Sequence, residues 1–75
     1  MTIWVLETSS RGRWDNMAAK GVYLTERKGL RAYHKLRKSI RKQTGLRVQW
    51  CTDADGCHVS ATGMLRLRLR PVVIT

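Results

Sequence analysis

Residues 65–70 read "LRLRLR", and this strict alternation constrains the fold more than any other stretch of the chain. Successive side chains of a β-strand point to opposite faces of the sheet. The pattern therefore predicts a strand whose leucines face a core and whose arginines face away from it. Pro71 and the β-prone "VVIT" follow, and a proline is expected at a sheet edge or at the end of a strand.

Further strands are predicted on either side of the middle of the chain. Residues 3–8 are apolar and β-branched, and the turn-forming "TSSRGRW" leads into a second strand at about 13–17, after which "AAKG" loosens the chain. Residues 46–51 alternate between apolar and polar side chains, and "DADG" at 53–56 is typical of a turn. The returning strand begins at 58–60, bends or bulges at Gly63 and continues through 64–70.

One long helix is predicted over residues 26–43. Thr25 followed by Glu26 is typical of a helix start, and Gly45 is typical of a helix end. Gly29 is expected to soften the first turn, at a cost of roughly 1 kcal/mol relative to alanine. Four apolar side chains fall within about a third of the circumference: Leu30, Tyr33, Leu36 and Ile40.

These elements predict an α+β fold in the order β-β-α-β-β. We expect an antiparallel sheet of four or so strands with one long helix packed on one face. Residues 1–75 form a single small basic domain, near the lower limit for a chain that folds on one core. The sequence leaves open whether the chain is a monomer or a homodimer joined by pairing of "VVIT" or by sheet packing.

The charge of the chain restricts the class of partner. Fifteen Lys and Arg against five Asp and Glu give a formal net charge of +10. Such a charge attracts nucleic acid, a nucleoprotein complex, an acidic protein face or an anionic membrane surface, although solubility is an alternative explanation. No apolar run is long enough to span a membrane and the N-terminus lacks a basic signal region, so we expect a cytoplasmic protein without a membrane partner.

The basic residues are expected on three surfaces. The first is the polar face of the helix, where Glu26 is the one acid of the segment and like-charge repulsion is left uncompensated. The second is a mobile hairpin tip, and the third is the arginine side of the C-terminal strand, which suits phosphate contacts but also the protection of a sheet edge. The helix and strand surfaces should lie on opposite sides of the domain. The candidate binding residues are Arg27, Arg31, Lys35, Lys38 and Lys42 on the helix, Arg11 and Arg13 at the tip, and Arg66, Arg68 and Arg70 on the strand.

Signatures of catalysis and of cofactor binding are missing. The chain has no glycine-rich phosphate loop, no Gly-x-Ser-x-Gly and no clustered carboxylates, so we expect neither an enzyme nor a cofactor. The potential metal ligands Cys51, Cys57, His34 and His58 do not have a common zinc spacing. Two separate thiols are the preferred interpretation, with a disulfide or a metal site as alternatives.

The opening "IWVLETSSRGRW", the Thr-Glu helix rich in Arg and Lys, and "LRVQW" after it resemble small accessory proteins of tailed bacteriophages. The resemblance covers about the first fifty residues, and the chain departs from it from Ala54 onward. It implies a non-catalytic binder, acting in the host cytoplasm if phage-encoded, and carries over no binding residue.

The leading hypothesis from the sequence is a non-catalytic protein that binds nucleic acid, or a nucleoprotein complex, electrostatically. Little sequence specificity is expected because no base-reading motif is present. The alternative is an inhibitor of a host enzyme or defence complex, of the transcription, nuclease or CRISPR type, that acts by protein–protein contact through a basic face.

Overall fold

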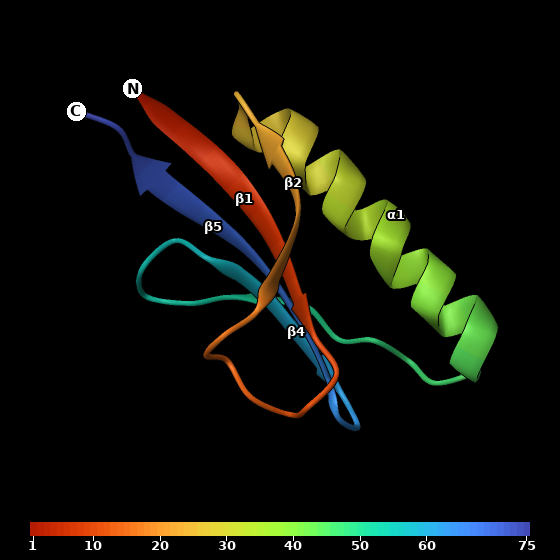
Figure 1. Cartoon of the computed structure of the whole chain (residues 1–75). Coiled ribbons are helices and arrows are strands. Elements are labelled where there is room, and N and C mark those ends of the chain that lie inside the picture. Colours follow the sequence, from red (N-terminus) through yellow and green to blue (C-terminus); the bar gives the residue numbers. More distant parts are fainter.

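The fold is α+β, with five strands and one helix. The computed structural model describes residues 1–75 and confirms the predicted architecture of one long helix on one face of an antiparallel sheet (Figure 1). The elements in chain order are β1 (Thr2–Ser9), β2 (Ala18–Tyr23), α1 (Glu26–Thr44), β3 (Cys51–Thr52), β4 (His58–Thr62) and β5 (Leu65–Val73).

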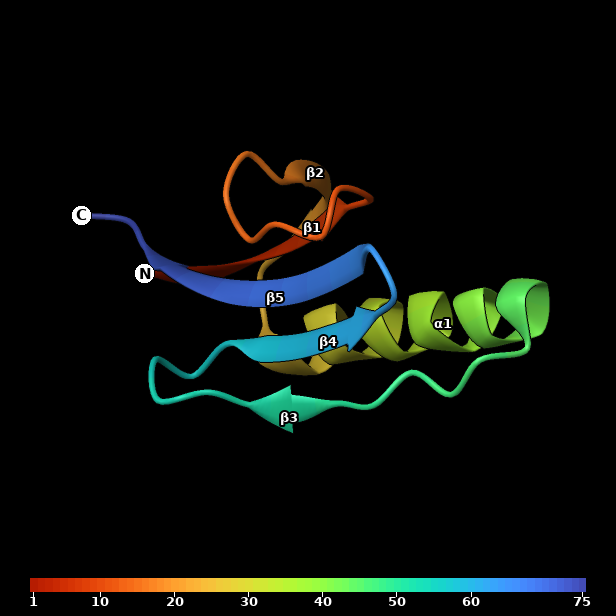
Figure 2. The same ribbon diagram turned by 90° about the horizontal axis from the view of Figure 1, so that it is seen from below.

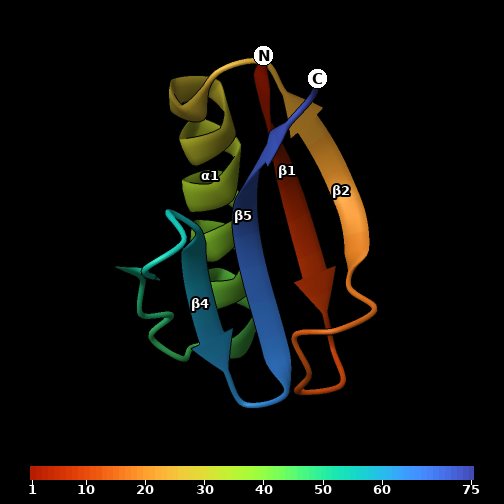
Figure 3. The ribbon, with the colours of Figure 1, turned by 90° about the vertical axis from the view of Figure 1, so that its left-hand side faces the viewer.

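The first and last strands lie side by side in the middle of the sheet. The strand order is β2-β1-β5-β4-β3, and α1 packs against β1, β2 and β5 (Figure 3). β1 and β5 are paired over eight residues, from Thr2↔Val73 to Ser9↔Arg66. The pairing continues beyond β5, because the Ile74 N–H donates to the Met1 carbonyl at 2.7 Å. The two termini therefore lie next to each other (Figures 1 and 3).

The alternation of β5 produces the core as predicted. Leu67 and Leu69 are completely or almost completely buried. They pack with side chains of β1, α1 and the segment after it, in a cluster of six residues: Leu6, Tyr33, Ile40, Val48, Leu67 and Leu69. The arginines between the leucines consequently face away from α1. The suggestion that they protect a sheet edge is wrong, since β5 is the central strand.

Two predicted strands differ from those observed. The second strand is Ala18–Tyr23 rather than 13–17, since the segment before it crosses the sheet and the Gly12 N–H donates to the Met64 carbonyl at 2.7 Å. Residues 46–50 form no strand, and β3 is limited to Cys51–Thr52. In that segment the Val48 carbonyl accepts a hydrogen bond from Arg37 Nη2 at 2.7 Å, so its backbone is satisfied by a helix side chain.

Pro71 lies inside β5 but beyond the end of β4. The last β4 pair is His58↔Leu69, so past this point β5 is an edge on that side and a missing N–H is tolerated. The "VVIT" segment pairs with β1 of the same chain, through Val72↔Ile3 and Val73↔Thr2. A homodimer stays a prediction, and strand pairing with a second copy has the outer edges of β2 and β3 available.

The turns and helix ends follow the sequence signals. Asp53 Oδ1 accepts from the N–H groups of Asp55 and Cys57, each at 2.9 Å, which confirms the turn at 53–56. Gly63 belongs to the tight turn between β4 and β5 rather than to a bulge. Thr25 Oγ1 caps the helix by accepting from the Lys28 N–H at 3.2 Å, and Gly45 ends it with φ +69°.

At Gly29, α1 packs tightly against the sheet. A β-carbon built there would lie 3.0 and 3.1 Å from the two Leu69 methyl carbons and 3.3 Å from Trp4 Cβ. Both the glycine and Leu69 are buried, so neither group has space to move away. The residue that should soften the helix is therefore the one that allows it to pack against β1 and β5.

A polar and aromatic cluster joins the segment after α1 to the rest of the molecule. Trp50 Nε1 donates to His58 Nδ1 at 3.2 Å, and since an indole can only donate, the neutral His58 ring carries its proton on Nε2, 3.4 Å from Glu26 Oε2. The Trp50 ring also lies edge-on to His34, with centroids 4.8 Å apart. These side-chain contacts hold Trp50 in place although residues 46–50 form no strand.

His34 is part of the same cluster and is held in its neutral form. Its Nδ1 accepts from Arg37 Nη1 at 2.9 Å. Burial lowers the pKa of His34, and the charge of Arg37 lowers it further. A protonated His34 would turn Nδ1 from an acceptor into a donor facing Arg37, the same side chain that binds the Val48 carbonyl.

We expect Gly29→Ala to destabilise the protein, although alanine is the better helix former. The contact with Leu69 should outweigh the gain in helix propensity and lower the free energy of unfolding by about 1 kcal/mol. Ser39→Ala, at an exposed site of the same helix, is the control and should raise it by a few tenths. Urea denaturation measures both variants, and a stabilised Gly29→Ala would show that the close approach is unimportant.

The stability of the protein should fall on acidification in a way that depends on His34. Because the pKa of His34 is lower in the folded state than the ordinary 6.5, the unfolded chain binds the proton more readily. The contribution of neutral His34 to the free energy of unfolding is therefore fully present above about pH 6.5. It decreases as the pH falls from there to the pKa of His34 in the folded state. Melting temperatures between pH 7.5 and 5.5 should show a smaller decrease for His34→Gln than for the wild type, and equal decreases would contradict this assignment.

Candidate nucleic-acid interface

Five of the predicted binding residues form a continuous stripe along α1. We define the helix stripe as Arg27, Arg31, Lys35, Lys38 and Lys42, all of which are exposed. At 100° per residue these positions fall within an arc of about 80°, and they extend for about 22 Å along the axis. The buried residues Gly29, Tyr33 and Ile40 lie on the opposite side of α1. The sheet therefore leaves the whole stripe open to a partner.

The helix stripe carries charge that nothing in the protein neutralises. None of its cations lies within 4.0 Å of a carboxylate, since the three ion pairs of the molecule involve other residues. Glu26, the one acid of α1, faces His58. Like charges four residues apart on a helix destabilise it when they have no partner. An anionic ligand on the stripe would remove this repulsion.

The arginine side of β5 is in a different electrostatic state. We call Arg66, Arg68 and Arg70 the arginine ladder. Glu7 of β1 lies directly opposite Arg68, and its Oε1 accepts from Arg68 Nε at 3.1 Å and from Arg70 Nε at 2.9 Å. The Glu7 side chain is only 10% exposed. Two of the three guanidinium groups thus share one buried carboxylate.

The third arginine of the ladder also has partners within the protein. Arg66 Nη1 donates to the carbonyls of Gly63 and Leu65, at 2.8 and 2.9 Å. Its guanidinium carbon lies 5.7 Å from the centre of the Trp14 ring, a distance typical of a cation–π contact. Reorienting this arginine toward a ligand would disrupt these interactions. The ladder is in large part a structural network that joins β1, β5 and the loop between β1 and β2.

The hairpin tip is attached to the sheet rather than free. The Gly12 N–H donates to the Met64 carbonyl, and Ser9 Oγ accepts from the Arg11 N–H at 3.3 Å. Trp14 is 38% exposed and lies against Arg66. The tip predicted to be mobile is therefore a loop whose middle is attached to the sheet by these contacts.

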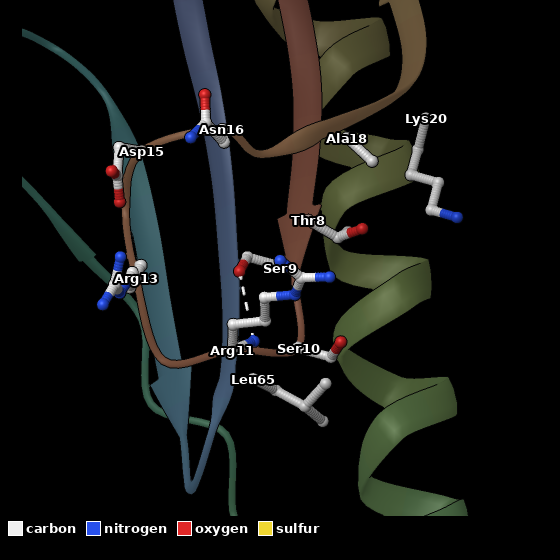
Figure 4. A pocket seen from close by; sticks show the side chains of 10 residues that line it. All are labelled: Thr8, Ser9, Ser10, Arg11, Arg13, Asp15, Asn16, Ala18, Lys20 and Leu65. Carbon is white, nitrogen blue, oxygen red and sulfur yellow. Dashed lines mark hydrogen bonds between the residues drawn. The ribbon is translucent and has the colours of Figure 1, made fainter.

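The loop between β1 and β2, together with the adjoining ends of the strands, lines an open hollow of about 870 Å³. Figure 4 shows its lining: Arg11 and Arg13 come from the loop, Lys20 from β2, and Thr8 from the end of β1. The side chains of Arg11, Lys20, Thr8 and Ser10 lie on the same side of the loop, whereas Arg13 and Asp15 lie on the other (Figure 4). Lys20 was not among the residues predicted from the sequence, because the strand that places it was expected elsewhere.

The structure does not bring all ten predicted residues together. The helix stripe lies on the outer side of α1, and the arginine ladder faces away from α1 on the far side of the sheet, as the sequence suggested. The hairpin tip is associated with the ladder through Trp14 and Met64. Figure 2 shows that the loop of β1 and β2 is well separated from α1, with β5 between them. A single extended partner can contact the helix stripe along its length, but it would have to wrap around the domain to contact all three basic surfaces.

Glu7, the carboxylate that forms ion pairs with two arginines of the ladder, was not identified from the sequence. It lies in an apolar strand among residues that alternate between the two faces, so it could be assigned to the face away from the core. Its pairing with Arg68 depends on a contact between residues 61 positions apart. No local pattern predicts which strand lies next to β1, and the only available signal was an acid in an otherwise basic chain.

The two cysteines are separate thiols in the structure. Both cysteines are free, with Cys51 exposed and Cys57 buried. Burial raises the pKa of the Cys57 thiol, and the nearby Asp53 raises it further. A thiol with a raised pKa is protonated at neutral pH and is a poor nucleophile. No three side chains of His, Cys, Asp or Glu are grouped closely enough to hold a metal ion.

No protein-family model, curated protein or solved structure matches this chain. The chain contains no helix that could span a membrane.

Replacing Glu7 by Gln should separate the structural role of the arginine ladder from a binding role. Loss of the carboxylate leaves Arg68 and Arg70 without their ion pair, and we expect the free energy of unfolding to fall by about 1–2 kcal/mol, less than for a fully buried pair because both arginines are partly exposed. The same change releases two guanidinium groups for a ligand.

Nucleic-acid affinity of Glu7→Gln is the second measurement, with Asp55→Asn as the control that makes the same charge change at an exposed turn. If the helix stripe is the interface, the two variants should bind with affinities within about twofold of each other. A much stronger gain for Glu7→Gln, measured by fluorescence anisotropy, would show that the ladder binds the ligand.

Proposed function

We propose that this protein is a non-catalytic module that binds nucleic acid through backbone phosphates, with the helix stripe as its main contact surface. The observation that carries the proposal is the stripe itself: five exposed cations on one side of α1 that have no carboxylate partner. Nucleic acid offers a regular row of negative charges of comparable extent, because duplex DNA carries one charge per about 1.7 Å of its axis.

The composition of the helix stripe supports phosphate contacts over base reading. Its members are lysine and arginine, and lysine binds phosphate as a point charge without a fixed geometry. Asparagine and glutamine, which read adenine, are absent from the stripe, and Gln43 is the one such residue in α1. We therefore expect affinity that depends little on sequence and strongly on salt.

The arginine ladder and the hairpin tip have secondary roles in this proposal. Arg68 and Arg70 are engaged by Glu7, and Arg66 is engaged by the loop. They add to the positive potential that attracts the ligand, which raises the rate of association without direct contact. A small phage-type accessory protein is one setting in which a module of this kind would act.

The first test is a mobility shift with random-sequence duplex DNA, single-stranded DNA and RNA at two salt concentrations. Strand ends are left unphosphorylated, so that internal phosphates are the only ones present. If the five cations each neutralise one phosphate of a duplex, the logarithm of the binding constant should fall with the logarithm of the salt concentration with a slope of about −4 to −5. Absence of a shift at low salt with micromolar protein contradicts the proposal and favours the inhibitor alternative.

The second test determines whether the helix stripe is the surface that binds nucleic acid. Lys35→Glu with Lys38→Glu should weaken binding by more than about tenfold and reduce the salt slope by about 2. Both side chains are exposed, so the melting temperature should change little. The control, Arg13→Glu with Arg47→Glu, makes the same change in net charge at two exposed sites away from the stripe. Equal losses of affinity in the two double variants would show that net charge alone, and not the stripe, determines binding.

A further inference from the structure

The hollow formed by the β1–β2 loop is a second cationic region, separate from the helix stripe. It lies where β1 ends and β2 begins, and its polar lining comes from both strands and the loop (Figure 4). Its volume of about 870 Å³ is within the range of small-ligand sites, roughly 300–1,000 Å³. Only two of its ten lining residues are hydrophobic, so a ligand that fits it is polar.

The charge of the hollow selects an anion. Arg11 and Lys20 extend on the side of the loop where Thr8 and Ser10 lie and give it a charge of +2, whereas Arg13 and Asp15 extend on the other side and their charges offset each other. None of the three cations forms an ion pair with Asp15 or with any other carboxylate, since the ion pairs of the protein lie elsewhere. Their charges are therefore available to a ligand. A phosphate monoester carries a charge of about −1.5 to −2 at neutral pH, which matches this excess.

Hydrogen-bond donors accompany these charges. Arg11 and Lys20 extend on the side of the loop where the hydroxyl groups of Thr8 and Ser10 also lie (Figure 4). Guanidinium, ammonium and hydroxyl groups together supply donors to the three terminal oxygens of a phosphate monoester. An internal phosphodiester has only two such oxygens and one charge, and is less well matched to a site of this kind.

The loop is held in shape before any ligand binds. Its middle is attached to the turn before β5 by the Gly12–Met64 hydrogen bond of 2.7 Å, and its start is stabilised by the Ser9–Arg11 hydrogen bond. Asn16, at the far side, has a φ of +54° and so helps to reverse the chain toward β2. A preorganised loop reduces the entropy lost on binding.

We propose that this hollow binds a phosphate monoester, carried either by a free nucleotide or by the 5′ end of a nucleic-acid strand. The proposal does not depend on the helix stripe, because it rests on different residues and on a different chemical group. If both sites act, the protein prefers strands that end in a 5′-phosphate, although it reads no sequence.

Isothermal titration calorimetry tests the proposal with three probes: an eight-nucleotide single-stranded DNA with a 5′-phosphate, the same DNA with a 5′-hydroxyl, and adenosine 5′-monophosphate. We expect at least about tenfold tighter binding for the phosphorylated DNA than for the hydroxyl form, or measurable binding of the mononucleotide. The first result identifies a strand end as the source of the phosphate, and the second identifies a free nucleotide.

The variant Arg11→Gln with Lys20→Gln should abolish this preference. Both side chains are exposed and form no ion pair, so the fold should remain intact, which the melting temperature verifies. The matched control is Arg31→Gln with Lys35→Gln, which removes the same two charges from the helix stripe. It should weaken both DNA probes equally and leave the ratio between them unchanged.

Two outcomes would overturn the proposal. One is a wild-type protein that binds the phosphorylated and hydroxyl DNA equally and does not bind the mononucleotide at millimolar concentration. The other is an equal loss of the 5′-phosphate preference in both double variants, which would attribute it to overall charge. Failure of the helix stripe in the earlier tests would leave the ratio measured here unaffected, so the two proposals can fail separately.

Discussion

The pairing of β1 with β5 is the interaction on which the rest of the structure depends. It joins the two ends of the chain at the centre of the sheet, over eight residue pairs. Through it Leu6 meets Leu69, and this apolar surface is the one that α1 covers. The same pairing brings Glu7 between Arg68 and Arg70 on the opposite face. One strand pair therefore organises both the core and the buried ion network.

That ion network explains why the two rows of positive charge, on β5 and on α1, are not equivalent. In the sequence, the arginines of β5 and the cations of α1 are equally prominent. In the structure, a carboxylate, two backbone carbonyls and an indole ring engage the arginines of β5, whereas the helix stripe has no such partners. The desolvation cost of placing Arg68 and Arg70 on the central strand is offset by their ion pairs with Glu7. The cations of α1 remain in water, where a ligand can reach them.

Local signals predicted those parts of the fold that local chemistry determines. The cap at Thr25, the end at Gly45 and the alternation in β5 are short-range patterns, and each was confirmed. The position of β2 and the absence of a strand at 46–50 were not predicted, because Gly12 and Val48 find their hydrogen-bond partners in distant residues. For the candidate site, the residues of the helix stripe and of the tip could be named from sequence, but Lys20 and Glu7 required the strand register.

The central place of β5 also has a consequence for how the protein is made. β1, β2 and α1 leave the ribosome before β5, and the core that they share stays incomplete until β5 adds Leu67 and Leu69. Long-range pairing of this kind slows folding and keeps apolar segments exposed for longer. The domain therefore folds after β5 has been synthesised rather than progressively. A product truncated before β5 would lack Leu67, Leu69 and the strand that joins β1 to β4, which leaves α1 only the paired strands β1 and β2 to pack on.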